Sequence, residues 1–192
     1  MIDDRLQRQL DFLVELDKLK LVLRRTRVVG ESRHENSAEH SWHLGVMASV
    51  LAEHAPAEVD LRRTLTMLLV HDVVEIDAGD TFAFDTAGNA DKEERERRAA
   101  ERLFGLLPPD QAAELRGLWD EFEARETTEA RYANALDRFH ALLLNVHNDG
   151  GTWREHRITR EQILVRMGPI REGAPPLWPY VLRVVDEVMG EG

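Results

Sequence analysis

Residues 68–80 place two kinds of chemically active side chain inside an apolar run. His71 and Asp72 are adjacent among Leu and Val, and the carboxylates Glu75 and Asp80 follow. A carboxylate buried in such a run is costly unless a cation or a metal ion satisfies it, and histidine is the commonest metal-binding side chain. On a helix, His71, Asp72 and Glu75 project toward one side. The stretch therefore predicts either a metal site with an acid one turn away, or a core helix whose His and Asp are only hydrogen-bonded.

Two further polar residues, His40 and Asp137, stand on otherwise apolar helical stretches. Together with His71 and Asp72 they give two imidazoles and two carboxylates from three separate segments. This ligand set suits first-row divalent ions such as Mn, Fe, Co, Ni or Zn better than Ca. The sequence has no cysteine, which excludes thiolate ligands and cysteine nucleophiles. With few protein ligands, coordination positions remain for water and substrate, as in a catalytic rather than a structural site.

The charge of the chain narrows the class of partner. The formal net charge is −11, and no block is rich in Lys or Arg. A nucleic acid polymer is therefore disfavoured as the ligand, whereas one or two local arginines could still bind a small phosphorylated molecule. The N-terminus lacks the apolar core of a signal peptide, and no run of about 18 apolar residues occurs. We expect a cytoplasmic protein without a membrane partner.

The spacing of apolar residues is helical throughout and predicts an all-α protein with no strand. A length of 192 residues, 43% of them hydrophobic, fits one globular domain with a substantial core. Capping residues mark three helix starts: Asn36 with Glu39, Asp60, and Thr159 with Gln162. We expect about seven or eight helices, over 5–24, 36–56, 61–76, 91–107, 110–125, 127–148 and 159–168, with a last helix after residue 176.

Three motifs in this order resemble the pattern of the HD-domain metal-dependent phosphohydrolases. They are ENSAEHS at 35–41, HDVVEIDAGD at 71–80 and ALDR at 135–138. The local context is similar to the 5′-deoxynucleotidase branch of that superfamily, and the resemblance covers roughly residues 10–150. A single His-Asp pair is a weak signal, but three matched contexts at suitable spacing are specific. The resemblance implies one HD-type helical domain over 1–192, with a metal and active-site core at about 20–150 and C-terminal helices at 159–190 packed on it.

The resemblance also implies roles for individual residues. Its pattern places the catalytic Glu on Glu75, the substrate-contacting Asp on Asp80 and the phosphate-binding Arg on Arg25. In the family a Trp that crowds the sugar follows this Arg, whereas this chain has Thr26, which puts a preference for deoxyribose in question. The histidines that would hold a second metal are not matched. We therefore expect one divalent ion (Mn, Co, Fe, Ni, Zn or Mg), and the four ligands implied are His40, His71, Asp72 and Asp137.

The expected activity is hydrolysis of (deoxy)nucleoside 5′-monophosphates or of similar small phosphorylated metabolites. The metal would lower the pKa of a bound water to give the nucleophile. Glu75 would orient this water or relay its proton, and Arg25 would neutralise charge on the phosphate. Asp80 would either hold a sugar hydroxyl or protonate the leaving oxygen. Two alternatives are a non-catalytic metal-containing module that senses nucleotides or metabolites, and a metal-dependent oxygenase, whose relatives use more histidine ligands.

Several other residues have two interpretations each. His43 could support the site from behind or be a structural histidine, and His140, one turn after Asp137, could hydrogen-bond that carboxylate. His147 and Trp153 could line the pocket or only pack in a loop.

The amphipathic helices expected at 91–107 and 110–125, and the apolar C-terminal helix, offer more apolar faces than a small core requires. As in the family that the chain resembles, we expect a homodimer.

Overall fold

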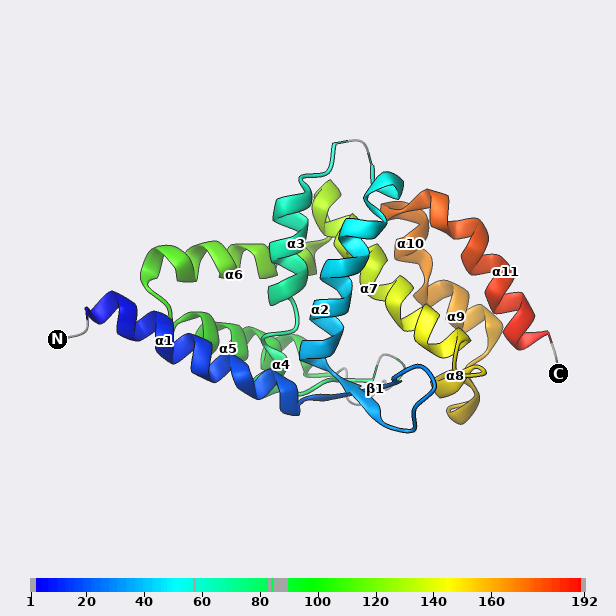
Figure 1. Ribbon diagram of the computed structural model, residues 1–192, viewed down its shortest axis with the longest axis horizontal. Helices are drawn as coiled ribbons and strands as arrows, with labels where there is room; N and C mark the ends of the chain where they lie inside the picture. Colours follow the sequence, from blue (N-terminus) through cyan, green and yellow to red (C-terminus); the bar gives the residue numbers. More distant parts are fainter. Residues whose placement is uncertain (1–2, 57, 83, 85–89, 191–192) are drawn as a thin grey trace.

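The computed structural model describes residues 3–56, 58–82, 84 and 90–190. This part of the chain is helical apart from one small two-stranded sheet, so the predicted all-α class is confirmed. The longer helices are α1 (Asp4–Leu16), α2 (Ser37–Val50), α3 (Leu61–Val70), α5 (Lys92–Phe104), α6 (Pro109–Ala124), α7 (Thr128–Val146) and α11 (Trp178–Met189) (Figure 1). The shorter ones are α4 (Glu75–Ala78), α8 (Gly151–Glu155), α9 (Arg160–Arg166) and α10 (Gly168–Gly173). Among the helices of the described residues, none has the length and apolar character that a membrane crossing needs.

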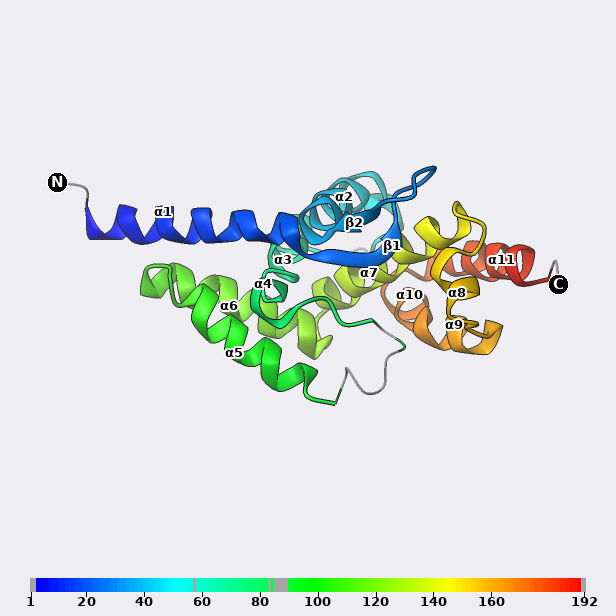
Figure 2. The same ribbon diagram turned by 90° about the horizontal axis from the view of Figure 1, so that it is seen from below.

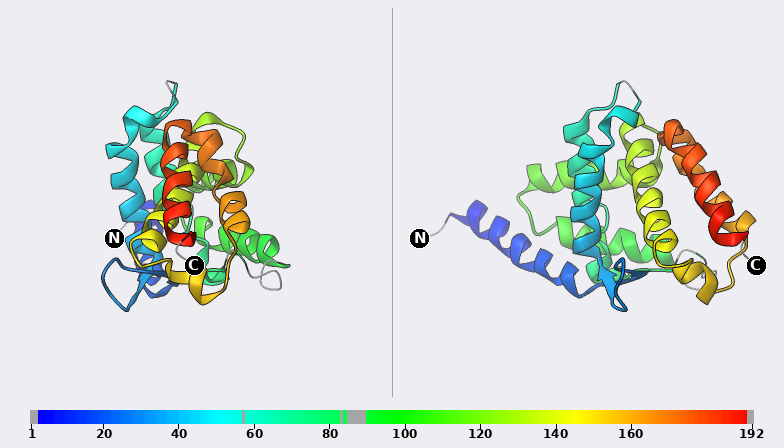
Figure 3. Two further views of the ribbon diagram at one scale, coloured as in Figure 1. Left: turned by 90° about the vertical axis from the view of Figure 1, so that its right-hand side faces the viewer. Right: turned by 45° about the vertical axis from the view of Figure 1, so that its right-hand side comes forward.

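Helix α7 forms the centre of the fold. Its residues are buried on nearly every side, and Tyr132, Leu136 and Leu142 are fully enclosed. Helices α2 and α3 pack against one side of α7, while α10 and α11 pack against another (Figures 1 and 3). Because α7 is buried along its length, a charged residue on it such as Asp137 must find its partners inside the protein.

The predicted helix starts are confirmed where a side chain caps the first turn. The Asn36 side chain accepts a hydrogen bond from the backbone N–H of Glu39, and the Glu39 carboxylate accepts one from the N–H of Asn36. Asp60 caps α3, and Thr159 caps α9. The capping box of α2 fixes where the helix begins, and therefore places His40 in its first turn.

The prediction that the chain has no strand is wrong. The helix expected over 5–24 ends at Leu16 and is followed by a 3₁₀ turn (Asp17–Leu21). The chain then forms β1 (Leu23–Arg27), which pairs antiparallel with β2 (His34–Asn36).

Tertiary contacts account for this small sheet. Arg24 reaches inward to Asp72, and the hydroxyl of Thr26 donates a hydrogen bond to the Glu35 carboxylate on the neighbouring strand. A two-stranded sheet is marginal by itself and depends on such packing. The local pattern of apolar residues does not contain these contacts, so the sequence did not predict the strands.

The helix expected over 61–76 is interrupted after Val70, next to the candidate ligands His71 and Asp72. Helix α3 stops at Val70, residues 71–74 form a turn, and α4 begins at Glu75. Within the turn, the backbone N–H groups of Val73 and Glu75 donate to carbonyls three residues earlier, as in a 3₁₀ helix. His71 itself still follows α3, because its N–H donates to the Met67 carbonyl four residues earlier, so the tighter winding changes the direction of Glu75 relative to His71.

Gly173 allows α10 to lie directly against α7. A Cβ atom at this position would overlap the carbonyl oxygen of Arg131 and lie 3.0 Å from the Cβ of Ala135, both on α7. Gly173→Ala therefore forces the two helices apart. We expect it to lower the free energy of unfolding by about 1–3 kcal/mol, measured by urea denaturation.

Gly117→Ala on α6 is the matched control, because a Cβ there meets no atom within 4 Å. Alanine is favoured over glycine inside a helix, so this variant should gain about 0.5–1 kcal/mol. Equal effects of the two substitutions would contradict the close approach at Gly173.

Candidate metal centre and active site

Four polar side chains from three parts of the chain converge in the interior. His40 lies in the first turn of α2, His71 and Asp72 in the turn after α3, and Asp137 in the middle of α7. His40 Nε2 is 3.1 Å from Asp137 Oδ1 and 3.8 Å from Asp72 Oδ2. His71 Nε2 is 3.1 Å from Asp72 Oδ1. All four residues are buried, so the structure brings together the residues expected to hold a metal.

The hydrogen bonding of His71 fits a metal ligand. Its Nδ1–H donates to the carbonyl oxygen of Leu68 at 2.8 Å, which leaves a lone pair on Nε2. This buried Nε2 has no hydrogen-bond partner in the described part of the chain, and it faces a carboxylate oxygen of Asp72. Two lone pairs at this distance repel each other unless a cation or a proton lies between them. Ligand atoms of His40, His71 and Asp72 lie within 4.8 Å of one another, close enough to share one divalent ion.

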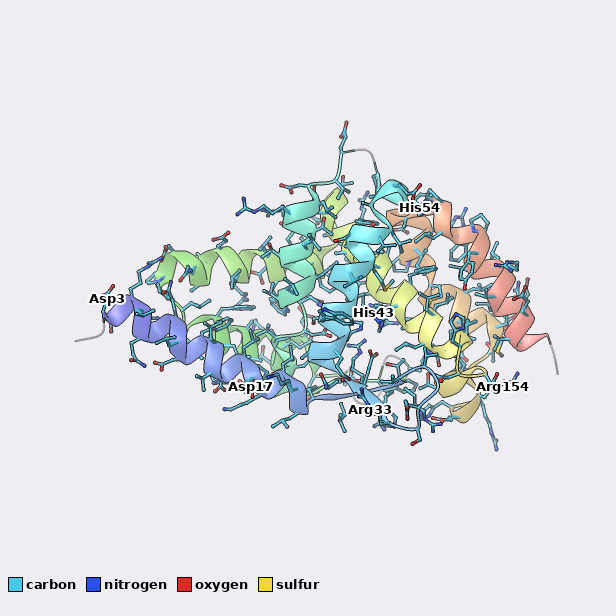
Figure 4. The ribbon with its side chains drawn as sticks, in the orientation of Figure 1. Asp3, Asp17, Arg33, His43, His54 and Arg154 are labelled. Carbon is cyan, nitrogen blue, oxygen red and sulfur yellow. The ribbon has the colours of Figure 1, made fainter. Side chains whose placement is uncertain are left out.

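A chain of imidazoles extends from His40 away from this cluster. His40 Nδ1 lies 2.9 Å from Nδ1 of His140 on α7, and His140 Nε2 lies 3.0 Å from Nδ1 of His43. His43 lies on α2 (Figure 4). Each pair needs one donor and one acceptor. When His40 offers its Nε2 lone pair to a metal, its Nδ1–H donates to His140, and the Nε2–H of His140 donates to His43. His140 therefore bonds to His40 and not to Asp137, and with His43 it fixes the ring and tautomer of His40.

The carboxylates share one buried arginine, Arg24 of β1. Its Nη1 donates to Asp72 Oδ2 at 2.8 Å, its Nε lies 3.4 Å from Glu35 Oε1, and its Nη2 lies 3.8 Å from Asp137 Oδ1. Burial would lower the pKa of Arg24, but the surrounding carboxylates, Asp72 above all, raise it beyond its usual value. Arg24 therefore stays cationic and offsets part of the negative charge of the cluster.

The carboxyl groups of the site titrate very differently. Burial raises the pKa of Asp72 to about 7, and burial together with the charge of Asp72 raises the pKa of Glu75 to about 8. Burial alone would also raise the pKa of Asp137, but the Arg138 guanidinium and the hydrogen bond with His40 hold it well below its usual range. A carboxyl group whose pKa lies near neutrality suits proton transfer in catalysis.

Glu75 lies beside the candidate ligands but is not a member of the closely spaced group His40, His71 and Asp72. The oxygen Oε2 of Glu75 accepts a hydrogen bond from the Ser37 hydroxyl at 2.6 Å. Ser37 is the first residue of α2, so the same helix that carries His40 also orients Glu75. This arrangement leaves a buried carboxyl group one turn after His71, where an acid or base would act on a molecule held by the cluster.

Two connected hollows open beside the cluster. The inner hollow contains the candidate ligands of the 71–72 turn and α7, and its lining includes His71, Asp72, Glu75 and Asp137. The outer hollow is lined by residues of β1, α7, α8 and α9 among others, including Arg25, Thr26, Asn145, Trp153 and Met167. Five residues border both hollows, namely Arg24, Asp80, Thr81, Arg138 and Arg166. The two hollows therefore adjoin along these five side chains.

The residues expected to contact substrate lie at these hollows. Asp80 borders both, and Arg25 is exposed at the edge of the outer one. The preceding residue, Arg24, is the arginine that turns inward to the carboxylates. The sequence did not distinguish these arginines, because alternate residues of a strand face opposite sides and the strand itself was not predicted.

Other residues in or near the site also escaped prediction or had two interpretations. Glu35, Arg138 and Arg166 were not predicted as site residues, since each is a single charged residue next to ordinary helix or loop signals. Trp153 is buried and lines the outer hollow, whereas His147 is exposed.

The chain matches a family model and several known proteins. The family model described as HD domain matches residues 16–178. Human 5′-deoxynucleotidase HDDC2 is 32% identical over 135 residues, which cover 70% of this chain and 65% of the relative. The 5′-deoxynucleotidase YBR242W of Saccharomyces cerevisiae is 27% identical over 140 residues, which cover 70% of this chain and 57% of the relative. The chain thus spans just under two thirds of the length of the human relative.

Two solved structures are similar to the whole chain. A predicted metal-dependent phosphohydrolase from Magnetospirillum magnetotacticum is 54% identical with a TM-score of 0.93, and the match covers 98% of this chain and 96% of that one. A conserved hypothetical protein from Pyrococcus furiosus is 20% identical with a TM-score of 0.64, covering 91% and 99% of the two chains. The second likeness shows a shared fold alone.

The raised pKa values of Asp72 and Glu75 predict how metal removal and pH act together. Both carboxyl groups titrate near pH 4 in an unfolded chain, but at about 7 and 8 in the folded, metal-free protein. Between these limits the folded state binds more protons than the unfolded one, so its stability falls as pH rises. A bound divalent ion removes this penalty by compensating the ionised carboxylates.

The melting temperatures of metal-loaded and chelator-treated protein should therefore differ more at pH 8 than at pH 6. Scanning calorimetry with excess Mn²⁺, and separately with excess chelator, measures both. A difference that is absent, or that shrinks as pH rises, would contradict the assignment of the metal to this cluster.

Proposed function

Because the chain belongs to the HD domain family, we propose that it hydrolyses phosphomonoesters with the aid of one divalent metal ion. The proposed ligands are His40, His71, Asp72 and Asp137. The observation that carries the proposal is the convergence of two imidazoles and two carboxylates in which the lone pair of His71 Nε2 faces Asp72 Oδ1 at 3.1 Å. The relatives named 5′-deoxynucleotidase and metal-dependent phosphohydrolase support this reaction class.

In the proposed reaction Glu75 handles the proton of the attacking water. A bound divalent ion supplies Lewis acidity, which polarises the phosphoryl oxygens and lowers the pKa of water. Glu75 lines the same inner hollow, its pKa lies near neutrality, and Ser37 fixes one of its oxygens. These properties suit a group that accepts a proton from water and passes it on.

In this proposal Arg25 binds the phosphate of the substrate, and Asp80 acts on a neighbouring part of it. Arg24 is already engaged by Asp72, whereas Arg25 at the edge of the outer hollow is open to an entering phosphate. Asp80 borders both hollows and either holds a hydroxyl group of the substrate or protonates the leaving oxygen.

The proposed substrates are (deoxy)nucleoside 5′-monophosphates or similar small phosphorylated metabolites. Thr26 lines the outer hollow, and its hydroxyl is engaged by Glu35. This small side chain stands where the resemblance places a crowding Trp, which supports acceptance of ribose as well as deoxyribose. A module that only senses its ligand would not require a buried carboxyl group beside the metal ligands, so Glu75 favours catalysis over sensing.

We further infer that the protein forms a homodimer. The apolar faces expected to mediate it are largely internal, since Leu103, Trp119 and Val184 of α5, α6 and α11 are buried. The exposed apolar residues lie instead along α1, which extends to one end of the molecule (Figure 2), and along α2. They are Leu6, Leu10, Leu13, Val14, Trp42, Val46 and Val50. Contact with a second copy would remove this surface from water. The expected cytoplasmic location stays a prediction.

Glu75→Gln and Asp72→Asn separate proton transfer from metal binding. Glu75→Gln keeps the shape of the side chain but removes its ability to accept a proton, so the rate of phosphate release should fall by about 10²–10⁴-fold while metal content stays full. Asp72→Asn weakens a direct ligand and should lose metal and activity together. Elemental analysis and phosphate release from a nucleotide panel with Mn²⁺ or Co²⁺ measure both effects.

Glu96→Gln is the matched control for Glu75→Gln. Glu96 is another largely buried carboxyl group of the inner hollow with a raised pKa, caused by burial, and it pairs with Lys92. Glu96→Gln should change the rate of phosphate release by less than about threefold, which is the size of an indirect effect. Loss of metal from Glu75→Gln would make Glu75 a ligand, and full activity of that variant would refute its proposed part in the reaction.

A further inference from the structure

One wall shared by the two hollows carries an unusual pair of arginines. Arg138 lies on α7, and Arg166 is the last residue of α9. Both side chains border the inner and the outer hollow. Burial and the nearby charge of Arg138 lower the pKa of Arg166 to about 10. The two guanidinium groups therefore border the same space.

The acid partners of this pair are few. Arg138 Nη1 donates to Asp137 Oδ2 at 2.7 Å, but its buried Nε has no hydrogen-bond partner in the described part of the chain. The side chain of Arg166 makes neither a hydrogen bond nor an ion pair with any described residue. The chain has 36 Asp and Glu against 25 Lys and Arg, and other arginines do find acids: Arg63 with Glu121, Arg102 with Asp77, and Arg160 with Asp186. The pair thus keeps unused donors beside the site.

Asp137 lies between His40 and Arg138. Oδ1 of this carboxylate faces His40, whereas Oδ2 is held by Arg138. Arg138 therefore approaches Asp137 on the side away from His40. Arg166 borders both hollows and keeps its donors for a ligand there.

The remaining wall of the outer hollow includes the carboxylate of Asp80, but part of it is apolar or has its polar groups already engaged. The Asn145 oxygen accepts hydrogen bonds from the backbone N–H and the hydroxyl of Thr152, and its amide donates to the Ala141 carbonyl. Trp153 and Met167 are apolar and buried. The donors open to a ligand there are largely those of guanidinium groups, which favour the planar, charge-assisted hydrogen bonds of phosphate and carboxylate.

We propose that Arg138 and Arg166 form an anion subsite, so that the natural substrate carries a second anionic group, phosphate or carboxylate, in addition to the phosphate that is hydrolysed. This inference rests on the proposed phosphohydrolase function and narrows its substrate class. The phosphate to be released lies at the metal cluster in the inner hollow. The second anion lies between Arg138 and Arg166, and the body of the substrate bridges the two.

Matched substrate pairs test the subsite by phosphate release from the metal-loaded protein. One pair is a nucleoside 5′-monophosphate and the 3′,5′-bisphosphate of the same nucleoside. The other is glycerol 3-phosphate and 3-phosphoglycerate, which differ by a carboxylate in place of a hydroxymethyl group. The doubly anionic member of at least one pair should have kcat/KM about tenfold higher or more, and the pair that shows the preference identifies phosphate or carboxylate as the second group.

Arg166→Gln should reduce kcat/KM for the preferred doubly anionic substrate about tenfold more than for its singly anionic partner, and Arg166→Lys should restore part of the difference. Arg171→Gln is the matched control, because Arg171 is an exposed arginine of α10 outside both hollows. It should leave the preference within about twofold of the unchanged protein. A thermal melt of each variant verifies that it is folded.

Two results would overturn the subsite while leaving the proposed function intact. One is the absence of any preference for doubly anionic substrates. The other is an equal loss on both members of a pair in Arg166→Gln, which would assign Arg166 to the hydrolysed phosphate.

If no substrate releases phosphate, the proposed function fails, and calorimetric binding of the nucleoside 3′,5′-bisphosphate decides the subsite separately. Binding weakened about tenfold by Arg166→Gln would support the subsite, and equal binding by both proteins would overturn it.

Discussion

The structure depends on the compensation of several carboxylates that are buried at one place. Glu35, Asp72, Glu75 and Asp137 are all less than a tenth exposed, and an ionised group in such surroundings costs several kcal/mol unless it is paired. Arg24 compensates part of this charge through Asp72, and Arg138 through Asp137. These arginines do not relieve the repulsion between the lone pairs of His71 Nε2 and Asp72 Oδ1, which face each other at 3.1 Å. A divalent ion bound at this point would join the three segments that carry its proposed ligands.

The fold around the cluster serves to hold its members in fixed directions. The capping box of α2 sets the position of His40, and the hydrogen-bonded chain through His140 and His43 sets its ring. The tight turn after α3 presents His71, whose other nitrogen is anchored to Leu68. The small sheet holds Arg24 of β1 so that its side chain reaches Asp72 in the same cluster. None of the groups that make these contacts is itself a proposed metal ligand. Each contact restricts the movement of a proposed ligand while charge develops on the substrate.

The sequence predicted those parts of the site that local signals determine. The caps of α2, α3 and α9 follow from short-range hydrogen bonds, and the helical class follows from apolar spacing. The order His40, His71, Asp72, Asp137 was read from residue type and motif, and these side chains do converge. The strand with Arg24, the break of the helix at Val70 and the arginine pair depend on contacts between distant segments. Arg138 and Arg166 are 28 positions apart in the sequence, and only the tertiary fold brings both to the lining of the same hollows.

Anomalous X-ray diffraction from crystals grown with Mn²⁺ tests the central assignment most directly. We expect one strong peak per chain within bonding distance of Nε2 of His40 and His71 and of carboxylate oxygens of Asp72 and Asp137. Glu35, His40 and His140 form a second group of buried potential ligands in the same region, with ligand atoms within 4.8 Å of one another. A peak at that second group, or no peak near His71 Nε2 at saturating Mn²⁺, would contradict the assignment of the metal centre.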